Sequence, residues 1–331
     1  CTGVTPLAAG TLHIGTGGTV GIIAGNVVNN AALIFNRSNA LTYGGVISGI
    51  GTLTKLSGGV LTLTGNNTFT GGTTISAGSL SIGGGGTIGS IAGNIINNAA
   101  LIFNRSNDLT YAGVISGSGT LQKTGAGVLS LTGNNLYTGT TSITTGTLSI
   151  GDGGISGSVV GNIANSATLR FNRSDNLSYG GVISGTGALQ KQAAGTLTLS
   201  GNNTYSGATT VSGGTLLLTG NKSGAGTTTV NAATNLQIGD GGLTGSIVGN
   251  ITDNGTVTFN RSNAITYASV ISGIGALQQL GAGVLTLTGA NTFTGVTTIA
   301  SGTLQIGTGG TVGSIAGNVV NNAALIFNRS N

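Results

Sequence analysis

The sequence predicts an all-β fold, a right-handed parallel β-helix (β-solenoid) of about 14–15 coils of 20–27 residues. The first observation is that close copies of the stretch from Thr52 to Gly78 recur, beginning at Thr120, Ala188 and Ala276. The second is that apolar residues such as Leu61 and Leu63 stand two apart with hydroxyl residues between them, which is the period of a strand. The third is composition: 66 residues are Gly, and Gly costs a helix interior about 1 kcal/mol relative to Ala.

Composition and charge exclude several classes of protein. Apolar residues are abundant and only 5% of residues are charged, so we do not expect charge-driven disorder. We expect no membrane span and no signal peptide in this chain, because no run of eighteen apolar residues occurs. The net charge of +5 is spread along 331 residues, which does not favour a nucleic-acid partner. Cys1, the one cysteine, is interpreted as the first residue of the sequence rather than a lipidated N-terminus.

One segment type recurs along the whole chain, with a small residue, Leu, any residue and an apolar residue in succession. Copies start at Thr11, Ala32, Thr52 and Ser79, at spacings of 21, 20 and 27, and similar spacings follow. The second position is Leu in fourteen copies and Val257 in one, and we expect these residues, including Leu53 and Leu80, to stack in register as one internal column. Since side chains two apart share a face of a strand, we expect this position and the position two later, as in Leu53 and Lys55, to point inward. The residue between them is expected to face water, as in His13, Thr54, Ser81, Gln122 and Arg170.

The repeats organise residues 1–331 as a single continuous β-solenoid with no separate globular domain. The distance from Phe35 to Phe103 and from Phe103 to Phe171 is 68 residues, which we interpret as a repeat of three coils. Between Phe171 and Phe259 it is 88 residues, because one extra coil is inserted at 215–234. An insertion equal to one coil indicates that the coil is the structural unit.

The long coils resemble a known family. The stretches from Gly51 to Gly83 and from Gly187 to Leu218 share the frame G-x-L-x-K, then L-x-L-x-G-x-N-x-[FY]-x-G-x-T, then G-x-L. This frame is similar to the passenger-associated transport repeat of bacterial autotransporters. Three copies keep Lys (Lys55, Lys123 and Lys191), and the fourth has Gln279. The resemblance implies a β-helix in a surface-displayed or secreted protein of a Gram-negative bacterium.

Residues 307–331 repeat residues 15–39 with one difference, Ser314 in place of Ile22. No polar capping element is evident at either end, and an open coil presents unpaired N–H and C=O groups. Two expectations follow: the natural chain continues beyond Cys1 and Asn331, or molecules stack end to end.

Recurring polar residues are interpreted as turn residues. Five arginines follow Phe-Asn and are expected in a row along one edge, as solvated turn residues rather than a polyanion stripe: Arg37, Arg105, Arg173, Arg261 and Arg329. Asparagines before each Arg and after the long-coil strands are interpreted as turn or ladder residues rather than ligand-binding residues: Asn36, Asn104, Asn172, Asn260, Asn328, Asn66, Asn134 and Asn202.

The acidic, histidine and aromatic residues predict no catalytic, metal or cofactor site. Asp152 and Asp240 occupy matching GDGG turns four coils apart, so they do not share an ion, and Asp108 and Asp175 are expected to pair with nearby arginines. His13 is expected at the surface. The periodic tyrosines are expected to fill corners rather than form a carbohydrate-stacking stripe: Tyr43, Tyr111, Tyr137, Tyr179, Tyr205 and Tyr267.

The sequence therefore favours a non-enzymatic, structural β-solenoid that forms the stalk of a surface adhesin or an extracellular fibre, on the cell surface of a Gram-negative bacterium. Its expected partners are itself or neighbouring repeats, end to end, with host or surface ligands as further candidates. The alternative is a filament subunit that stacks through open coils. A polysaccharide-active β-helix enzyme is a remote third hypothesis, because a fold does not by itself confer chemistry.

Overall fold

The computed structural model describes residues 3–330, and Cys1 therefore lies outside the described residues. The described chain falls into two compact units, residues 3–152 with 156–168 and residues 153–155 with 169–330. Every element in the described part is a β-strand, and these strands pair in parallel. The predicted fold class is thus confirmed as a parallel β-solenoid, and the described residues make about 16 turns rather than the 14–15 coils that were predicted. No helix in residues 3–330 has the length and apolarity needed to span a membrane.

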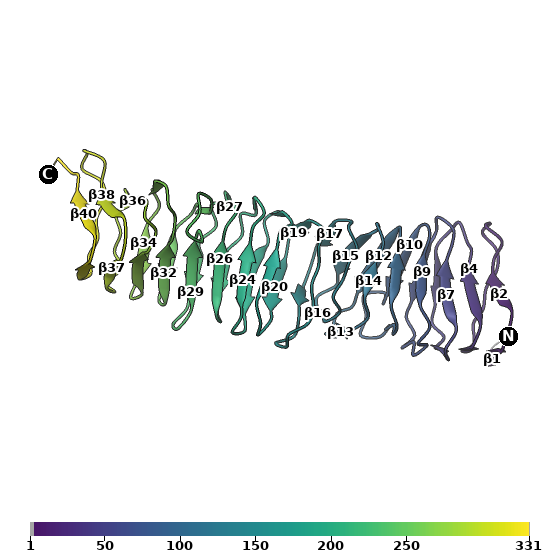
Figure 1. Cartoon of the computed structure of the whole chain (residues 1–331). Helices are drawn as coiled ribbons and strands as arrows, with labels where there is room; N and C mark the ends of the chain where they lie inside the picture. The colour runs from purple at the N-terminus through teal and green to yellow at the C-terminus, as the bar shows by residue number, and fades with distance from the viewer. Residues whose placement is uncertain (1–2, 331) are drawn as a thin grey trace. The chain divides into compact units, whose positions relative to one another are not determined.

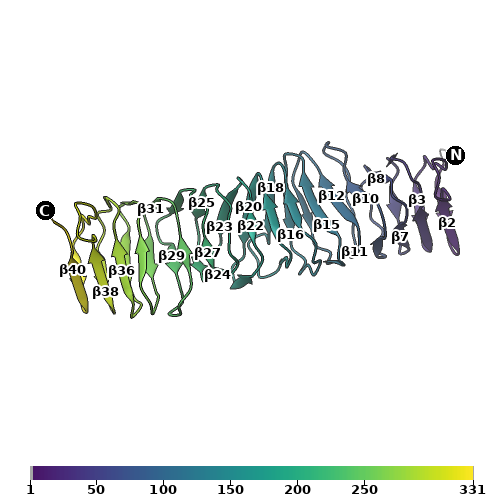
Figure 2. The same ribbon diagram turned by 90° about the horizontal axis from the view of Figure 1, so that it is seen from above.

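The first unit contains nineteen short strands in its described residues. They are β1 (Thr5–Leu7), β2 (Thr11–Ile14), β3 (Val27–Asn29), β4 (Ala32–Phe35), β5 (Leu41–Tyr43), β6 (Ile47–Ser48), β7 (Thr52–Lys55), β8 (Val60–Leu63), β9 (Thr73–Ile75), β10 (Ser79–Ile82), β11 (Ile95–Asn97), β12 (Ala100–Asn104), β13 (Leu109–Tyr111), β14 (Ile115–Ser116), β15 (Thr120–Thr124), β16 (Val128–Leu131), β17 (Thr141–Ile143), β18 (Thr147–Ile150) and β19 (Ile163–Asn165). Figure 1 shows β2, β4 and β7 side by side, and Figure 2 shows the same for β10, β12 and β15.

The second unit continues from β20 (Thr168–Asn172), whose residues from Leu169 on belong to it. The others are β21 (Leu177–Tyr179), β22 (Ile183–Ser184), β23 (Ala188–Gln192), β24 (Thr196–Leu199), β25 (Thr209–Val211), β26 (Thr215–Leu218), β27 (Asn221–Lys222), β28 (Thr228–Val230), β29 (Asn235–Ile238), β30 (Ser246–Ile247), β31 (Ile251–Asp253), β32 (Thr256–Phe259), β33 (Ile265–Tyr267), β34 (Ile271–Gly273), β35 (Ala276–Gln279), β36 (Val284–Leu287), β37 (Thr297–Ile299), β38 (Thr303–Ile306), β39 (Val319–Asn321) and β40 (Ala324–Phe327).

The register of the first unit corrects the predicted coil length. Leu53 pairs with Leu33 on one side and with Thr73 on the other, whereas Leu80 pairs with Leu61 and Leu101. Leu53 and Leu80 are therefore not neighbours, and the predicted column that joined them is wrong. Strand partners in this unit are separated by nearly the same length of chain throughout, so the longer coil that we expected from Thr52 to Ser79 does not occur.

A uniform turn has a physical reason. Each turn bonds through its backbone to the turns on either side, so all turns need nearly the same perimeter. The longer segment from Thr52 to Ser79 makes one full turn and about a third of the next turn. The 68-residue repeat thus makes about three and a third turns, and equivalent strands fall in different sheets: β4 lies in the sheet β2-β4-β7-β9-β11-β14, and β12 lies in the sheet that runs from β5 through β10 and β15 to β19.

The inserted coil in the second unit keeps the register. Leu197 pairs with Leu216, and Leu216 pairs with Leu236. The strand that opens the inserted coil, β26, therefore stacks in line with β24 on one side and β29 on the other. The continuity of residues 1–331 as one solenoid stays a prediction.

The interior is filled mainly by aliphatic and aromatic side chains. Leu33, Leu53 and Leu80 are fully buried, as predicted for the inward positions. Burial of a Leu side chain contributes about 2 kcal/mol before conformational entropy is subtracted. Ser81, which we expected to face water, is buried instead, and its Oγ donates to the carbonyl of Gly83 at 2.8 Å.

Candidate functional site

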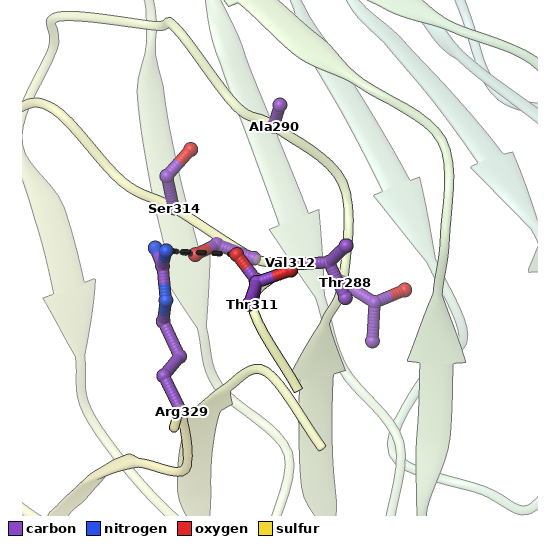
Figure 3. Close-up of a pocket in the computed structure, with 7 residues that line it drawn as sticks. Thr288, Ala290, Thr311, Val312, Ser314 and Arg329 are labelled. Atoms are coloured by element: carbon purple, nitrogen blue, oxygen red, sulfur yellow. Dashed lines mark hydrogen bonds between the residues drawn. The ribbon is translucent and has the colours of Figure 1, made fainter. Parts of the chain in front are cut away.

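The recurring arginines hold the Gly-rich turns. In Arg105, Nη1 donates to the Gly89 carbonyl at 2.7 Å and Nη2 to the Thr87 carbonyl at 2.6 Å. Its Nε donates to Asn107 Oδ1 at 3.0 Å. Arg261 repeats this pattern, and Figure 3 shows Arg329 reaching the turn that contains Thr311. The arginines are turn residues, as predicted. Their guanidinium groups donate to backbone carbonyls, however, and are not simply solvated.

The arginines do not form the single row that we expected. Arg37 follows β4 and Arg105 follows β12, and these strands belong to different sheets of the first unit. In the second unit, Arg261 follows β32 and Arg329 follows β40, again in different sheets. Because each 68-residue repeat advances by a third of a turn, its turns point in a new direction. The geometry therefore excludes a continuous basic stripe within either unit.

The three lysines of the long-coil frame, Lys55, Lys123 and Lys191, are buried at the inward position, with 2% of each residue exposed. Nζ of Lys191 donates to three backbone carbonyls, those of Gln192 at 2.9 Å, Ala193 at 2.8 Å and Gly213 at 2.9 Å. Burial lowers the pKa of Lys191 to about 8. At the fourth copy, Gln279 Nε2 takes the same role by donating to the carbonyls of Gly281 and Gly283.

Lys222 in the inserted turn is a fifth member of this group, and the sequence did not reveal it. Its Nζ donates to the carbonyls of Gly224 at 2.7 Å and Gly226 at 3.1 Å, and it lies 5.2 Å from the centre of the Tyr205 ring. Burial lowers its pKa to about 8. The one feature of the sequence that could have indicated its burial is that Lys222 falls at an inward position of the period-2 pattern.

The asparagines have the turn roles that were predicted, and a second set lies deeper. Asn66 Oδ1 accepts from the N–H of Gly89 at 3.1 Å. The adjacent Asn67 is buried, accepts from the N–H of Ile47 and donates to the carbonyls of Gly65 and Ser90. Sequence reasoning missed Asn67 and its equivalents, although they fall at inward positions of the period-2 pattern.

The carboxylates serve separate turns. Asp175 pairs with Arg173 at 2.6 Å, as predicted, and the hydrogen bond from Arg173 holds the pKa of that carboxyl below its usual range. The expected pairing of Asp108 with Arg105 is wrong, because Oδ1 of Asp108 instead accepts from the N–H of Val128 at 2.8 Å. Asp240 Oδ1 accepts from the N–H of Gly242. Within residues 3–330 there is no group of three or more His, Cys, Asp or Glu side chains placed to hold a metal ion.

The tyrosines fill corners, which confirms the prediction. The Tyr111 hydroxyl donates to the Gly93 carbonyl at 2.6 Å, and its ring lies 5.6 Å from that of Phe103. Tyr137 and Tyr205 are fully buried, and burial raises their pKa values. Buried rings present no face to a sugar, so the tyrosines form no carbohydrate-stacking stripe.

Two surface pockets contain no catalytic grouping among their lining residues. Figure 3 shows one, which is lined by Thr288, Ala290, Thr311, Val312, Gly313, Ser314 and Arg329. It offers hydroxyls and a guanidinium but no group that would activate a nucleophile. The other contains the exposed His13, as predicted for a surface residue, with no carboxylate among its lining residues. The fold and these contacts define a repetitive parallel β-solenoid whose recurring polar residues hold its turns.

Comparisons with known proteins agree with this class. The family described as passenger-associated-transport repeat matches residues 53–82, 121–150, 189–218 and 277–306. The chain is also similar to the adhesin BmaC autotransporter of Brucella suis biovar 1 (strain 1330), with 36% identity over 171 residues, 45% of this chain and 5% of that protein. The chain thus corresponds to a small part of that relative. No solved structure matches. The predicted resemblance to an autotransporter passenger β-helix is confirmed.

Proposed function

We propose that this chain is a non-catalytic structural stalk of a passenger adhesin, displayed at the surface of a Gram-negative bacterium. The fold, the four transport repeats and the similarity to an autotransporter adhesin support this proposal. A stalk requires length and stiffness, and stacked parallel turns provide both, because each turn bonds to its neighbours through the backbone.

The observation that carries the proposal is the use of the recurring polar side chains. Arg105 holds two carbonyls of a turn, Lys191 holds three, and Asn67 bonds to three backbone groups. Groups already bonded to their own backbone serve to fix turn geometry. The repeated residues thus explain the architecture without a ligand.

The carboxylates support a non-enzymatic role in the same way. Asp108, Asp240 and Asp253 each accept from a backbone N–H, and Asp175 pairs with Arg173. Hydrolysis of a glycosidic bond by paired carboxylates needs two of them within about 5 to 10 Å. Partners are proposed as neighbouring repeats of the same polypeptide, with host or surface ligands bound elsewhere in the intact protein.

The test is to change the length of the segment in the intact adhesin. Duplicating residues 35–102 adds one 68-residue repeat, which is about three and a third turns and, at about 4.8 Å per turn, roughly 16 Å. We expect surface display and adhesion to persist, and electron microscopy to show the added length.

A matched control duplicates residues 35–68, which is half of the repeat and does not restore the register. We expect it to impair folding and display. If duplication of 35–102 gives a folded, displayed protein that no longer adheres, or if surface substitutions within this segment abolish adhesion with the fold intact, the segment is a binding surface and not a stalk.

A further inference from the structure

One buried carboxyl group breaks the pattern of the asparagines. Asn29, Asn97 and Asn165 end strands at equivalent inward positions, and in the fourth repeat that position is Asp253. Asn97 uses both ends of its amide: Oδ1 accepts from the N–H of Ala99, and Nδ2 donates to the carbonyl of Thr120 at 2.8 Å. Asn29 does the same with Ala31 and Thr52. Each side chain thereby joins its own turn to the next one.

Asp253 occupies the same place but makes half of these bonds. Its Oδ1 accepts from the N–H of Gly255 at 3.0 Å, and its side chain lies against Gly275, as the side chain of Asn97 lies against Gly119. Its Oδ2 is buried and has no hydrogen-bond partner, and the residue is fully buried. The carbonyl that corresponds to that of Thr120 belongs to Ala276, which follows Asp253 at the same spacing. A carboxylate has no proton to donate to a carbonyl, whereas a carboxylic acid has one.

We propose that Asp253 is a proton-controlled latch between two successive turns of the second unit. When protonated, Oδ2–H donates to the carbonyl of Ala276 and completes the bond that Asn makes in the other repeats. When ionised, it directs a buried negative charge at a carbonyl oxygen, and the turn loosens. This inference goes beyond the stalk function and does not depend on it.

The surroundings leave the carboxyl group without a compensating charge. In its sheet, β31 packs between β28 and β34, and the adjoining face carries β32 and β35; these four strands contain no charged or titratable side chain. Burial therefore raises the pKa of Asp253 to about 6, while the Gly255 hydrogen bond opposes this. Because the folded state holds its proton more tightly than the unfolded state, stability falls as the pH rises from about 4 to about 6 and is level above that.

Peptide-resolved hydrogen exchange of the whole chain between pH 4 and pH 7 tests the latch. The pKa of Asp253 is about two units higher in the folded state than in the unfolded state. The opening constant of the turn around 253–276 should therefore increase about 100-fold over this range, after correction for intrinsic exchange. Asp253→Asn should remove this increase and should make the turn as protected at pH 7 as the equivalent turn around 97–120. The reciprocal variant Asn97→Asp should introduce the same pH dependence into the first unit.

A direct titration makes the outcome independent of the variants. The carboxyl carbon of Asp253, followed by NMR in the wild-type chain, should titrate near pH 6. A midpoint below about 4.5, or an unchanged pH dependence of exchange in Asp253→Asn, would overturn the proposal. If Asp253→Asn fails to fold, the wild-type titration and Asn97→Asp decide the question.

Discussion

Replacing Phe69 with Tyr should stabilise the first unit. Thr73 Oγ1 is buried without a hydrogen-bond partner. In the next repeat the residue equivalent to Phe69 is Tyr137, whose hydroxyl lies 2.6 Å from Thr141 Oγ1. Phe69 is fully buried in the equivalent corner, so we expect the added hydroxyl to find the same space and the same partner.

The magnitude follows from the bond that is gained. A net intramolecular hydrogen bond contributes about 1 kcal/mol, and an unsatisfied buried hydroxyl costs about 1 to 3 kcal/mol. We therefore expect Phe69→Tyr to raise the free energy of unfolding by about 1 to 2 kcal/mol. In a unit of this size, about 1 kcal/mol raises the melting temperature by about 2 to 4 °C.

The assay is thermal and chemical unfolding of a double-mutant cycle that adds Thr73→Val. The stabilising effect of Phe69→Tyr should vanish when Thr73 is Val, and the coupling energy should be about 1 kcal/mol. Phe293→Tyr is a matched variant in the second unit, because Thr297 Oγ1 likewise has no partner. A destabilised Phe69→Tyr, or an equal effect with and without the Thr73 hydroxyl, would refute the reasoning.

Three further predictions address the corners, the buried lysines and the turn length. Gly71→Ala should destabilise the fold by about 1 to 3 kcal/mol in denaturant titrations, because its Cβ would overlap the carbonyl oxygen of Gly51, whereas Gly58→Ala, with nothing within 4 Å, should be neutral. Lys191→Met should lower the unfolding free energy at pH 7 by about 2 kcal/mol, because three carbonyls lose their donor. The pKa of Lys191 is about 8 in the folded state and 10.5 in the unfolded state. The unfolding free energy of the wild type should therefore rise relative to that of Lys191→Gln as the pH increases from about 8 to 10.5. A difference between the two unfolding free energies that does not change over this range would contradict the prediction. Deleting residues 215–234 should leave a folded chain by circular dichroism and proteolysis, because the register is kept, whereas deleting 215–224 should not.

Alternation within single strands predicted much of the interior, although Ser81 is buried rather than exposed. The period-2 alternation identified Leu53 as inward and His13 as outward, and the repeat length identified Tyr111 as a corner residue. These predictions succeeded because alternation and burial are properties of a single strand. They depend little on which strand lies beside it.

Pairing between strands could not be read in the same way. The long spacing between Thr52 and Ser79 is compatible with a wider coil or with a turn and a third. Only the parallel ladder, in which Thr52 and Ser79 lie in different sheets, distinguishes them. The same ambiguity led to the incorrect prediction that the arginines form a single row. Likewise, the position of Lys55 in the inward column did not show that its ammonium group caps turn carbonyls, because that depends on backbone orientation.

A distance measurement across the long repeat tests the uniform turn most directly. Thr54 and Thr74 are paired outward positions on β7 and β9, so spin labels there, in a Cys1→Ser background, should lie on strands about 4.8 Å apart. We expect the electron paramagnetic resonance spectrum to show strong dipolar broadening relative to the two singly labelled chains. A spectrum equal to the sum of the two single-label spectra would show that Thr54 and Thr74 are not stacked and that the uniform turn is wrong.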